Sequence, residues 1–270
     1  MFVHGMPTNG RMWRGVIDAL GRDDEVVALD LPGFGGPAPA GWLATKENYV
    51  EWLIRQIEEL HARSGPIHLV GHDWGCLLTL RAASLRPELL KTVTAGNGPI
   101  DEHWPRHAFW NTWMPMGGGE RFMRDVLTPR TAEALMLAGH FPPEDAGRTL
   151  WSRAEGRQIT LDLYRSAVNV GREWGPDLPK IVIPSLLIWG TRDMIVPIEI
   201  GRRMAARIGA EVVALDAGHF WPYELPAEVA ALLRKHFARA DAWPQTILTQ
   251  DAAAVVASGR YEQGDPPASR

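Results

Sequence analysis

A sharp turn between a strand and a helix is the sequence feature that most constrains the fold of this chain. Residues 66–70 predict a short buried strand, and residues 76–83 predict a helix. Between them stands Gly71-His72-Asp73-Trp74-Gly75, with a glycine two positions before and two positions after Asp73. Glycine is needed where the chain is too crowded to leave room for a Cβ atom. The pattern is typical of a nucleophile elbow, with Asp73 as the reactive residue at its apex.

Strand and helix patterns alternate on both sides of this turn. Strand patterns stand at residues 1–3, 25–30, 90–95, 184–190 and 211–215, and helix patterns at residues 11–21, 50–60, 198–208 and 227–238. This alternation predicts a mostly parallel sheet with right-handed crossovers and helices on both faces. The expected fold class is therefore α/β.

A long segment without a clear strand interrupts the alternation. Residues 100–177 contain short helical stretches and many tryptophans, broken by Gly117-Gly118-Gly119 and Pro142-Pro143. Because this insertion lies between two strands of the predicted core, we expect it to form a helical cap. The predicted division is a core of residues 1–99 and 178–240, a cap of residues 100–177 and a loose C-terminal tail of residues 241–270.

Composition limits the classes of protein to which the chain can belong. Its 270 residues are 46% hydrophobic and 22% charged, enough for one α/β domain with an insertion. The net charge of -4 argues against nucleic acid or an anionic membrane as a partner. No apolar run reaches the roughly 20 residues of a membrane span. The single cysteine, Cys76, excludes an internal disulfide, and the nine histidines show no spacing typical of a metal site.

Neither a cofactor nor a secretion signal is predicted. No glycine-rich dinucleotide fingerprint opens the first strand–helix unit, so no cofactor is expected. The first five residues lack the charged and apolar regions of a signal peptide, which favours a cytoplasmic protein. The oligomeric state is left open by the sequence.

Four motifs in a consistent order resemble the α/β-hydrolase fold. They are His4-Gly5-Met6-Pro7, the turn at Asp73, Gly190-Thr191-Arg192-Asp193 and Gly218-His219. An aspartate at the turn is similar to the branch that holds epoxide hydrolases and haloalkane dehalogenases. The resemblance covers about residues 1–239 and is weakest in the cap. The first two strands of the family have no counterpart here, so we expect the sheet to begin at Val3 with an exposed or differently covered edge.

This resemblance implies a catalytic triad of Asp73 as nucleophile, Asp193 as orienting acid and His219 as base. Free aspartate has a pKa of about 4 and is ionised at neutral pH, so the nucleophile needs no activating base. It can attack an sp³ carbon and form an alkyl ester, against which His219 then activates water. The backbone N–H groups of Met6 and Trp74 are the candidates for the oxyanion hole.

Each of these assignments has a competing interpretation. Asp73 could cap the helix that follows it, although a cap does not need flanking glycines. His219 could be an ordinary core histidine. Asn97 and Asp101 follow another strand, from which some relatives supply the acid. Asp193 is favoured because its loop matches the family loop and position 97 is not an acid.

The cap offers a candidate group for opening an epoxide. Relatives stabilise the alkoxide with cap tyrosines, and Tyr164 resembles the residue that supplies one of them. A second tyrosine commonly stands earlier in the cap, but none lies between Ile100 and Tyr164. That role is either empty or filled by His107, Trp110 or His140.

Halide release would instead require N–H donors around the leaving ion. Trp74 is one candidate, although epoxide hydrolases also have tryptophan at this position. A cap tryptophan, such as Trp110, Trp113 or Trp151, is a second candidate, although core packing is the more common use of tryptophan. Haloalkane dehalogenases usually have Asn or Glu where this chain has Met6, whose side chain cannot donate.

Together these features predict a hydrolase that acts through a covalent aspartyl ester on a small, uncharged, apolar substrate and water. Tyr164 favours an epoxide hydrolase, and haloalkane dehalogenase is the alternative. A catalytically inactive or truncated hydrolase-like binding protein is the alternative from another class.

Overall fold

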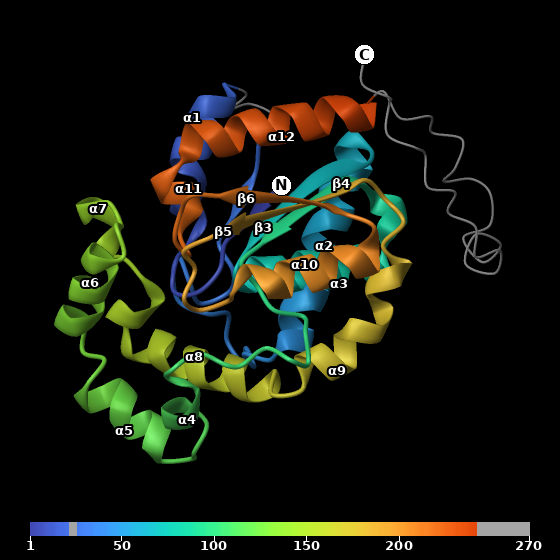
Figure 1. Cartoon of the computed structure of the whole chain (residues 1–270). Coiled ribbons are helices and arrows are strands. Elements are labelled where there is room, and N and C mark those ends of the chain that lie inside the picture. The colour runs from blue at the N-terminus through green and yellow to red at the C-terminus, as the bar shows by residue number, and fades with distance from the viewer. Residues whose placement is uncertain (22–25, 242–270) are drawn as a thin grey trace.

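Six parallel strands form the centre of the protein, in the order β2-β1-β3-β4-β5-β6 (Figure 1). The computed structural model describes residues 1–21 and 26–241. The strands are β1 (Phe2–Val3), β2 (Ala28–Leu29), β3 (Ile67–His72), β4 (Leu90–Gly96), β5 (Ser185–Gly190) and β6 (Glu211–Leu215). This confirms the α/β class and the mostly parallel sheet.

Helices cover both faces of the sheet, as the alternating pattern predicts. Figure 1 shows α1 and α12 on one face and α2, α3 and α10 on the other. Their bounds are α1 (Arg14–Leu20), α2 (Lys46–Ser64), α3 (Trp74–Leu85), α10 (Ile198–Ile208) and α12 (Pro226–Asp241), with α11 (Trp221–Glu224) before α12 and the 3-10 turns η1 (Gly10–Trp13) and η3 (Pro87–Leu89).

Alternating side chains of the strands form two separate apolar clusters, one on each face. Leu69 and Leu187 belong to the cluster shared with α2, α3 and α10. Their chain neighbours Val70 and Ile188 belong to the cluster shared with α1 and α12. Successive strand residues point to opposite faces, so a continuous apolar strand such as β5 is buried on both sides.

A helical segment connects β4 to β5 and lies along one side of the core (Figure 1, green to yellow). Its first part contains α4 (Trp110–Trp113), α5 (Gly118–Asp125), α6 (Pro129–Ala138) and α7 (Pro143–Ala146). Its second part contains η4 (Leu150–Ser152), α8 (Ala154–Ser166), α9 (Val170–Trp174) and η5 (Gly175–Lys180). These helices occupy the segment for which the sequence predicts a cap.

One expectation about the sheet is wrong. The sheet does not have its edge at Val3, because β1 pairs with β2 on one side and with β3 on the other. Strand β2 forms the edge instead, and only Ala28 and Leu29 of the predicted strand 25–30 have strand geometry among the described residues. Apart from Asp241, the last residue of α12, the predicted tail of residues 241–270 lies outside the described residues.

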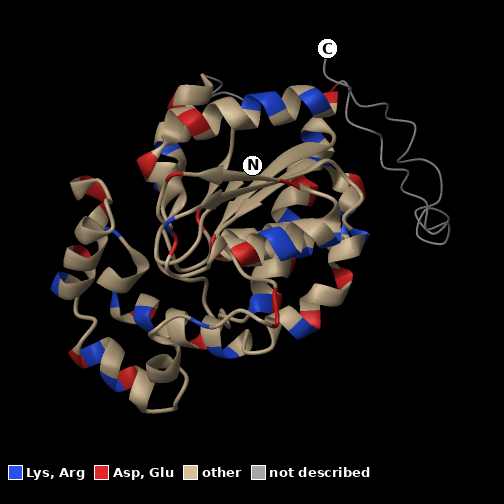
Figure 2. Cartoon of the chain, in the orientation of Figure 1, with Lys and Arg blue, Asp and Glu red and all other residues tan. Residues whose placement is uncertain are grey.

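Charged residues of both signs are interspersed along the outer helices in the view of Figure 2. None of the helices in residues 1–21 and 26–241 combines the length and the apolar character needed to cross a bilayer.

Candidate active site

Asp73 lies at the apex of the turn between β3 and α3. Its backbone has φ 55° and ψ -119°, a conformation that L residues seldom adopt and that is typical of functional sites. The surrounding glycines are required by close packing. A Cβ atom on Gly71 would collide with the carbonyl group of Gly75, and one on Gly75 would collide with the carbonyl oxygen of Val3. The strained turn therefore packs directly against β1, and only glycine fits at positions 71 and 75.

His219 lies between two carboxylates. Its Nδ1 is 2.8 Å from Oδ2 of Asp193, and its Nε2 is 3.5 Å from Oδ2 of Asp73. The three side chains come from loops at the carboxyl ends of β3, β5 and β6, which share one edge of the parallel sheet, with β4 between β3 and β5. All three residues are buried. The structure thus brings together Asp73, Asp193 and His219, the residues for which the sequence predicts the roles of nucleophile, acid and base.

Four donors surround the carboxylate of Asp193. Oδ2 accepts from His219 and from the side-chain amide of Asn97, at 2.8 and 2.5 Å. Oδ1 accepts from the backbone N–H groups of Ile195 and Val196, at 2.7 and 3.1 Å. Burial alone would raise the pKa of Asp193, but the charge of His219 and these hydrogen bonds outweigh burial and lower it. Asp193 is therefore held as an anion.

The two carboxylates also act on His219. Burial would lower the pKa of its imidazole, but Asp193 and, to a smaller extent, Asp73 stabilise the charged form and raise the pKa to about 10. Since Asp73 contributes to this shift, neutralising Asp73 would lower the pKa of His219. The protonation state of His219 is thereby coupled to the chemical state of Asp73.

The two oxygens of Asp73 have different partners. Oδ1 accepts a hydrogen bond of 2.6 Å from the backbone N–H of Met6, and Oδ2 is the oxygen that faces His219. Gly5 allows this approach, because a Cβ atom there would collide with the Asp73 side chain. Trp74 is the first residue of α3, so its N–H has no partner within the helix. Met6 and Trp74 thus flank Asp73 with backbone donors, as predicted for an oxyanion hole.

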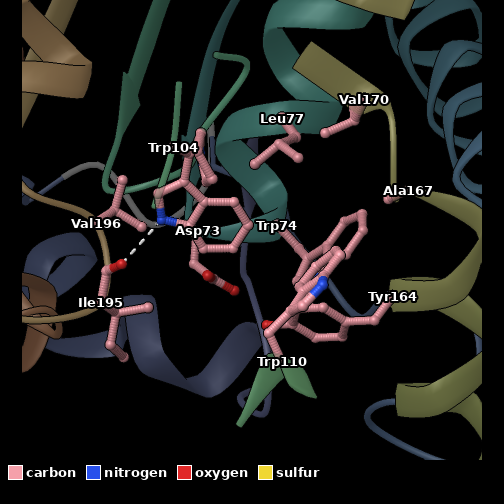
Figure 3. A pocket seen from close by; sticks show the side chains of 11 residues that line it. Asp73, Trp74, Leu77, Trp104, Trp110, Tyr164, Ala167, Val170, Ile195 and Val196 are labelled. Atoms are coloured by element: carbon pink, nitrogen blue, oxygen red, sulfur yellow. Dashed lines mark hydrogen bonds between the residues drawn. The ribbon is translucent and has the colours of Figure 1, made fainter. Parts of the chain in front are cut away.

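The carboxylate of Asp73 points into a pocket with a cavity volume of about 20 Å³ (Figure 3). Apart from Asp73, every lining side chain is uncharged, and most are apolar or aromatic. The lining residues are Asp73, Trp74, Leu77, Pro99, Trp104, Trp110, Tyr164, Ala167, Val170, Ile195 and Val196. A lining of this kind suits an apolar molecule.

The comparisons with known proteins agree with this geometry. The profile of the alpha/beta hydrolase family matches residues 1–232. The chain belongs to this family. It is 31% identical over 238 residues to the (E)-2-((N-methylformamido)methylene)succinate hydrolase of Acinetobacter baylyi, covering 85% of this chain and 86% of that protein.

Two further matches name the activities that the sequence suggests. The hydrolase is 24% identical to epoxide hydrolase 3 of Xenopus tropicalis, over 87% of this chain and 70% of the relative. The crystal structure of an ancestral haloalkane dehalogenase matches with a TM-score of 0.71 and 21% identity, covering 90% of this chain and 91% of that one. The likeness to the haloalkane dehalogenase structure, at 21% identity, supports the fold alone.

Two of the three predicted cap residues reach the active-site pocket of the hydrolase. Tyr164 and Trp110 line it together with Asp73 (Figure 3). Trp113 does not line it. The ring of Trp113 lies 5.0 Å from that of Tyr164 and 6.0 Å from that of Trp151, so it supports the pocket wall from behind.

The other cap candidates also lie outside the lining. Trp151 donates its indole N–H to Thr160, which removes it as a halide donor. The ring of His107 packs 5.3 Å from that of Tyr164, and burial lowers the pKa of His107 to about 4. His140 is exposed on the cap surface. The position of a second cap tyrosine is therefore not taken by His107 or His140 in this structure.

Sequence reasoning missed two residues of the hydrolase site. Asn97 was weighed only as a possible acid, yet its side chain joins Asp193 to the backbone of Gly190. The position of Asn97 directly after β4 could have indicated its role, because the carboxyl ends of neighbouring parallel strands lie along the same edge of the sheet. Trp104 lines the pocket and donates its indole N–H to the carbonyl of Ile195, at 3.0 Å. Nothing in the sequence distinguishes it from the other cap tryptophans.

Among the described residues of the hydrolase, no group of three or more His, Cys, Asp or Glu side chains is arranged to hold a metal ion.

Proposed function

We propose that the hydrolase opens small epoxides through a covalent ester on Asp73. The observation that carries this proposal is the arrangement around its carboxylate. Oδ1 is held by the N–H of Met6, whereas Oδ2 lies 3.5 Å from Nε2 of His219 at the floor of a pocket that Tyr164 also lines. One oxygen is therefore positioned for the oxyanion hole, and the other is available as nucleophile.

In the first step, Oδ2 of Asp73 attacks a ring carbon of the epoxide. The new O–C bond forms as the ring C–O bond breaks, and the electron pair moves to the epoxide oxygen, which takes a proton from the Tyr164 hydroxyl. Burial raises the pKa of Tyr164, as does the charge of Asp73, so the hydroxyl stays protonated until the alkoxide forms. The phenolate then recovers a proton from solvent.

In the second step, water attacks Cγ of the ester while His219 takes one of its protons. The charge that develops on Oδ1 is stabilised by the N–H groups of Met6 and Trp74. The bond between Cγ and Oδ2 then breaks, Oδ2 takes the proton back from His219 and leaves as a hydroxyl of the diol, and the new carboxyl group of Asp73 releases its proton to solvent. Esterification removes the charge of Asp73, so the pKa of His219 falls when a neutral imidazole is needed as base.

The chemistry of the pocket supports an apolar substrate. Apart from Asp73, its lining carries no charged side chain, and aromatic rings of Trp74, Trp104, Trp110 and Tyr164 surround the carboxylate (Figure 3). The part of the substrate over Asp73 is accordingly small, uncharged and apolar. The likeness to epoxide hydrolase 3 of Xenopus tropicalis points in the same direction.

A single turnover in H₂¹⁸O tests the covalent route. Because water attacks Cγ of Asp73, we expect ¹⁸O in the peptide that contains Asp73, and the first diol released from a terminal epoxide to be unlabelled. In the His219→Gln variant, the same peptide should carry the mass of the alkyl ester. Label that goes directly into the diol, with no ester in the variant, would exclude this mechanism and indicate direct attack by water. Neither diol nor ester would favour the inactive binding protein.

Tyr164→Phe tests the step that opens the ring. We expect ester formation from an epoxide to slow by about 100-fold, the range of general acid catalysis, measured by rapid quench and mass spectrometry. Tyr49→Phe is the matched control, since Tyr49 lies outside the pocket lining and its hydroxyl donates to the carbonyl of Pro32. Equal rates in the wild type and in Tyr164→Phe would remove the basis for preferring epoxides.

Haloalkane dehalogenation is the second candidate, supported by the position of Trp110. Its indole lines the pocket beside Trp74, and two N–H donors are what a leaving halide requires. Met6 contributes no side-chain donor, which is why this activity ranks second. Bromide release from 1-bromoalkanes that is lost in Trp110→Phe, with no diol formed from epoxides, would reverse the order.

A further inference from the structure

Trp104 belongs to the wall of the active-site pocket and also contacts the loop that carries Asp193. It lies on the segment that leaves β4, and its indole N–H donates to the carbonyl oxygen of Ile195, at 3.0 Å (Figure 3). The residue is buried, and it lines the pocket over Asp73 together with Ile195 and Val196. One indole is therefore part of both the substrate site and the surroundings of the catalytic acid.

A single peptide group lies between Trp104 and Asp193. The carbonyl oxygen of Ile195, which accepts from the indole, belongs to the same peptide group as the N–H of Val196. That N–H donates to Oδ1 of Asp193, at 3.1 Å. When one peptide group both accepts and donates a hydrogen bond, each bond polarises the group and strengthens the other. The indole N–H thus begins a chain of hydrogen bonds that ends on the acid.

The carboxylate at the end of this chain also holds His219. Its Oδ2 is 2.8 Å from Nδ1 of His219, whereas its Oδ1 accepts from the N–H groups of Ile195 and Val196. The two oxygens belong to one planar group, so the donors on Oδ1 determine how Oδ2 is directed at the imidazole. A shift of the peptide group between Ile195 and Val196 would therefore turn the carboxylate away from His219.

An ion pair anchors the segment that carries Trp104. Asp101, three residues earlier, is buried and accepts two hydrogen bonds from the guanidinium group of Arg203 on α10, at 2.8 and 3.2 Å. The carbonyl oxygen of Asp101 accepts from the backbone N–H of Trp104. Helix α10 begins at Ile198, two residues after Val196. The indole and the loop that it contacts are therefore both attached to the same core helix.

We propose that Trp104 is a positioning residue for the catalytic acid, and that its indole N–H keeps Asp193 directed at His219. The inference rests on the proposed function for the two steps that it separates. Attack of Asp73 on the substrate does not use Asp193, whereas activation of water by His219 does. Loss of the indole N–H therefore slows hydrolysis of the ester and not its formation.

Trp104→Phe tests this difference between the steps, because it keeps an aromatic ring in the pocket wall and removes the N–H. In rapid-quench measurements with a saturating terminal epoxide, we expect ester hydrolysis to slow by about 10-fold, as for the loss of one hydrogen bond, and ester formation to stay within about 2-fold of wild type. The ester should therefore accumulate in the variant. Equal slowing of both steps would overturn the proposal, because a general loosening of the pocket has that effect.

Benzothienylalanine at position 104 separates the hydrogen bond from the shape of the ring. It replaces the indole N–H by sulfur at nearly the same volume, so it should slow ester hydrolysis as Trp104→Phe does. Hydrolysis at the wild-type rate in this protein would overturn the proposal, and this protein decides if Trp104→Phe does not fold.

Trp151→Phe is the matched control. The indole of Trp151 also donates a hydrogen bond within the cap, to Thr160 at 3.1 Å, but it lies outside the pocket lining and away from the Asp193 loop. Both steps should stay within about 2-fold of wild type in this variant. Slowed hydrolysis here as well would mean that any lost indole hydrogen bond in the cap has the effect, which would overturn the specific role of Trp104.

The titration of His219 tests the same contact without turnover. Although burial acts to lower it, the pKa of His219 is raised to about 10, mainly by Asp193. NMR of histidine-labelled protein should show that His219 titrates at a lower pH in Trp104→Phe and at the wild-type pH in Trp151→Phe. An unchanged titration in Trp104→Phe would exclude the positioning role. A lowered titration in a protein whose wild type forms no ester from epoxides would exclude the proposed function and leave the role of Trp104 standing.

Discussion

Asn97 joins three polar groups beneath the active site. Its amide nitrogen donates to Asp193, and its oxygen accepts from the backbone N–H of Gly190 and from the indole N–H of Trp221, at 3.2 and 3.0 Å. The residue is fully buried, and its φ of 52° is better tolerated by Asn than by most other residues. One side chain thus fixes both the catalytic acid and the loop that carries it.

Replacing Asn97 by Ala should destabilise the protein and the site together. Two buried N–H groups would lose their acceptor, at about 1–3 kcal/mol each, so we expect the free energy of unfolding to fall by about 2–6 kcal/mol. Urea unfolding followed by tryptophan fluorescence measures this change. Asn111→Ala, at an exposed position of α4, should stay within about 0.5 kcal/mol of wild type. A loss of similar size in both variants would refute the role given to Asn97.

His219 should make stability depend on pH in a defined direction. Its pKa is raised from 6.5 to about 10 in the folded protein, so the folded state binds the proton more tightly than the unfolded state. The stabilisation is fully present below pH 6.5 and is lost as the pH rises towards 10. We expect the free energy of unfolding to decrease over this interval in the wild type and to decrease less in His219→Gln. Parallel pH profiles of the two proteins would contradict the raised pKa.

At the scale of elements, the junction of β3 and α3 depends on close contact with β1. A Cβ atom on Gly75 would collide with the carbonyl oxygen of Val3 and lie 2.7 Å from that of His4. Both are backbone atoms of the strand and loop that also carry Met6, so neither can move without displacing the oxyanion hole.

Gly75→Ala should therefore cost about 3 kcal/mol of stability, the upper range for overpacking. It should also reduce ester formation at Asp73, because the strained turn would shift. Thermal melting and the rapid-quench assay measure the two effects. Gly36→Ala is the control, since a Cβ atom there meets nothing within 4 Å. If the Gly75→Ala variant is as stable as the wild type, β1 can move away from residue 75 and the prediction is wrong.

The helices and strands of the core could be predicted because apolar residues recur along them in the pattern of an amphipathic helix or of a buried strand. Apolar positions 50, 53, 54, 57 and 60 predict α2, and the continuous apolar run of residues 186–189 predicts a strand buried on both faces. Asp73, Asp193 and His219 could be predicted from the loops that follow β3, β5 and β6. The position of β2 at the edge of the sheet could not be predicted, because a strand of two apolar residues carries no information about the strand with which it pairs.

At the scale of the whole molecule, the helical character of the segment between β4 and β5 was predictable, but not which of its side chains face the pocket. Trp104, Trp110 and Trp113 lie within ten residues of one another, yet the first two line the pocket and the third packs behind Tyr164. Their orientation depends on how short helices pack on the core, which a local pattern does not encode.

A small polar network ties the cap to the core. The buried carboxylate of Asp145, on α7, accepts from Nε of Arg11 at 2.7 Å and from the hydroxyl of Tyr223 at 3.2 Å. Close by, the N–H of Leu150 donates to the carbonyl of Pro7. Arg11 and Tyr223 belong to η1 and α11 of the core, so Asp145 connects one end of the cap to two core elements.

Asp145→Ala should loosen this end of the cap and leave the sheet intact. Hydrogen bonds to charged groups contribute about 1.5–3 kcal/mol, so hydrogen exchange in residues 129–152 should accelerate at least 10-fold. Exchange in β3 and β4 should not change. Glu144→Ala, at the exposed neighbouring position, is the control. Uniform acceleration across the protein would mean that cap and core open as one unit.

The hydrogen bonds around Asp193 give proton movement in this site a single direction. A carboxylate has about four acceptor positions, and here His219, Asn97, Ile195 and Val196 occupy them. No vacancy is left for a proton or a water molecule on that side of the imidazole. Every proton that His219 gains or releases during a reaction must therefore cross its Nε2, the nitrogen that faces the oxygen of Asp73.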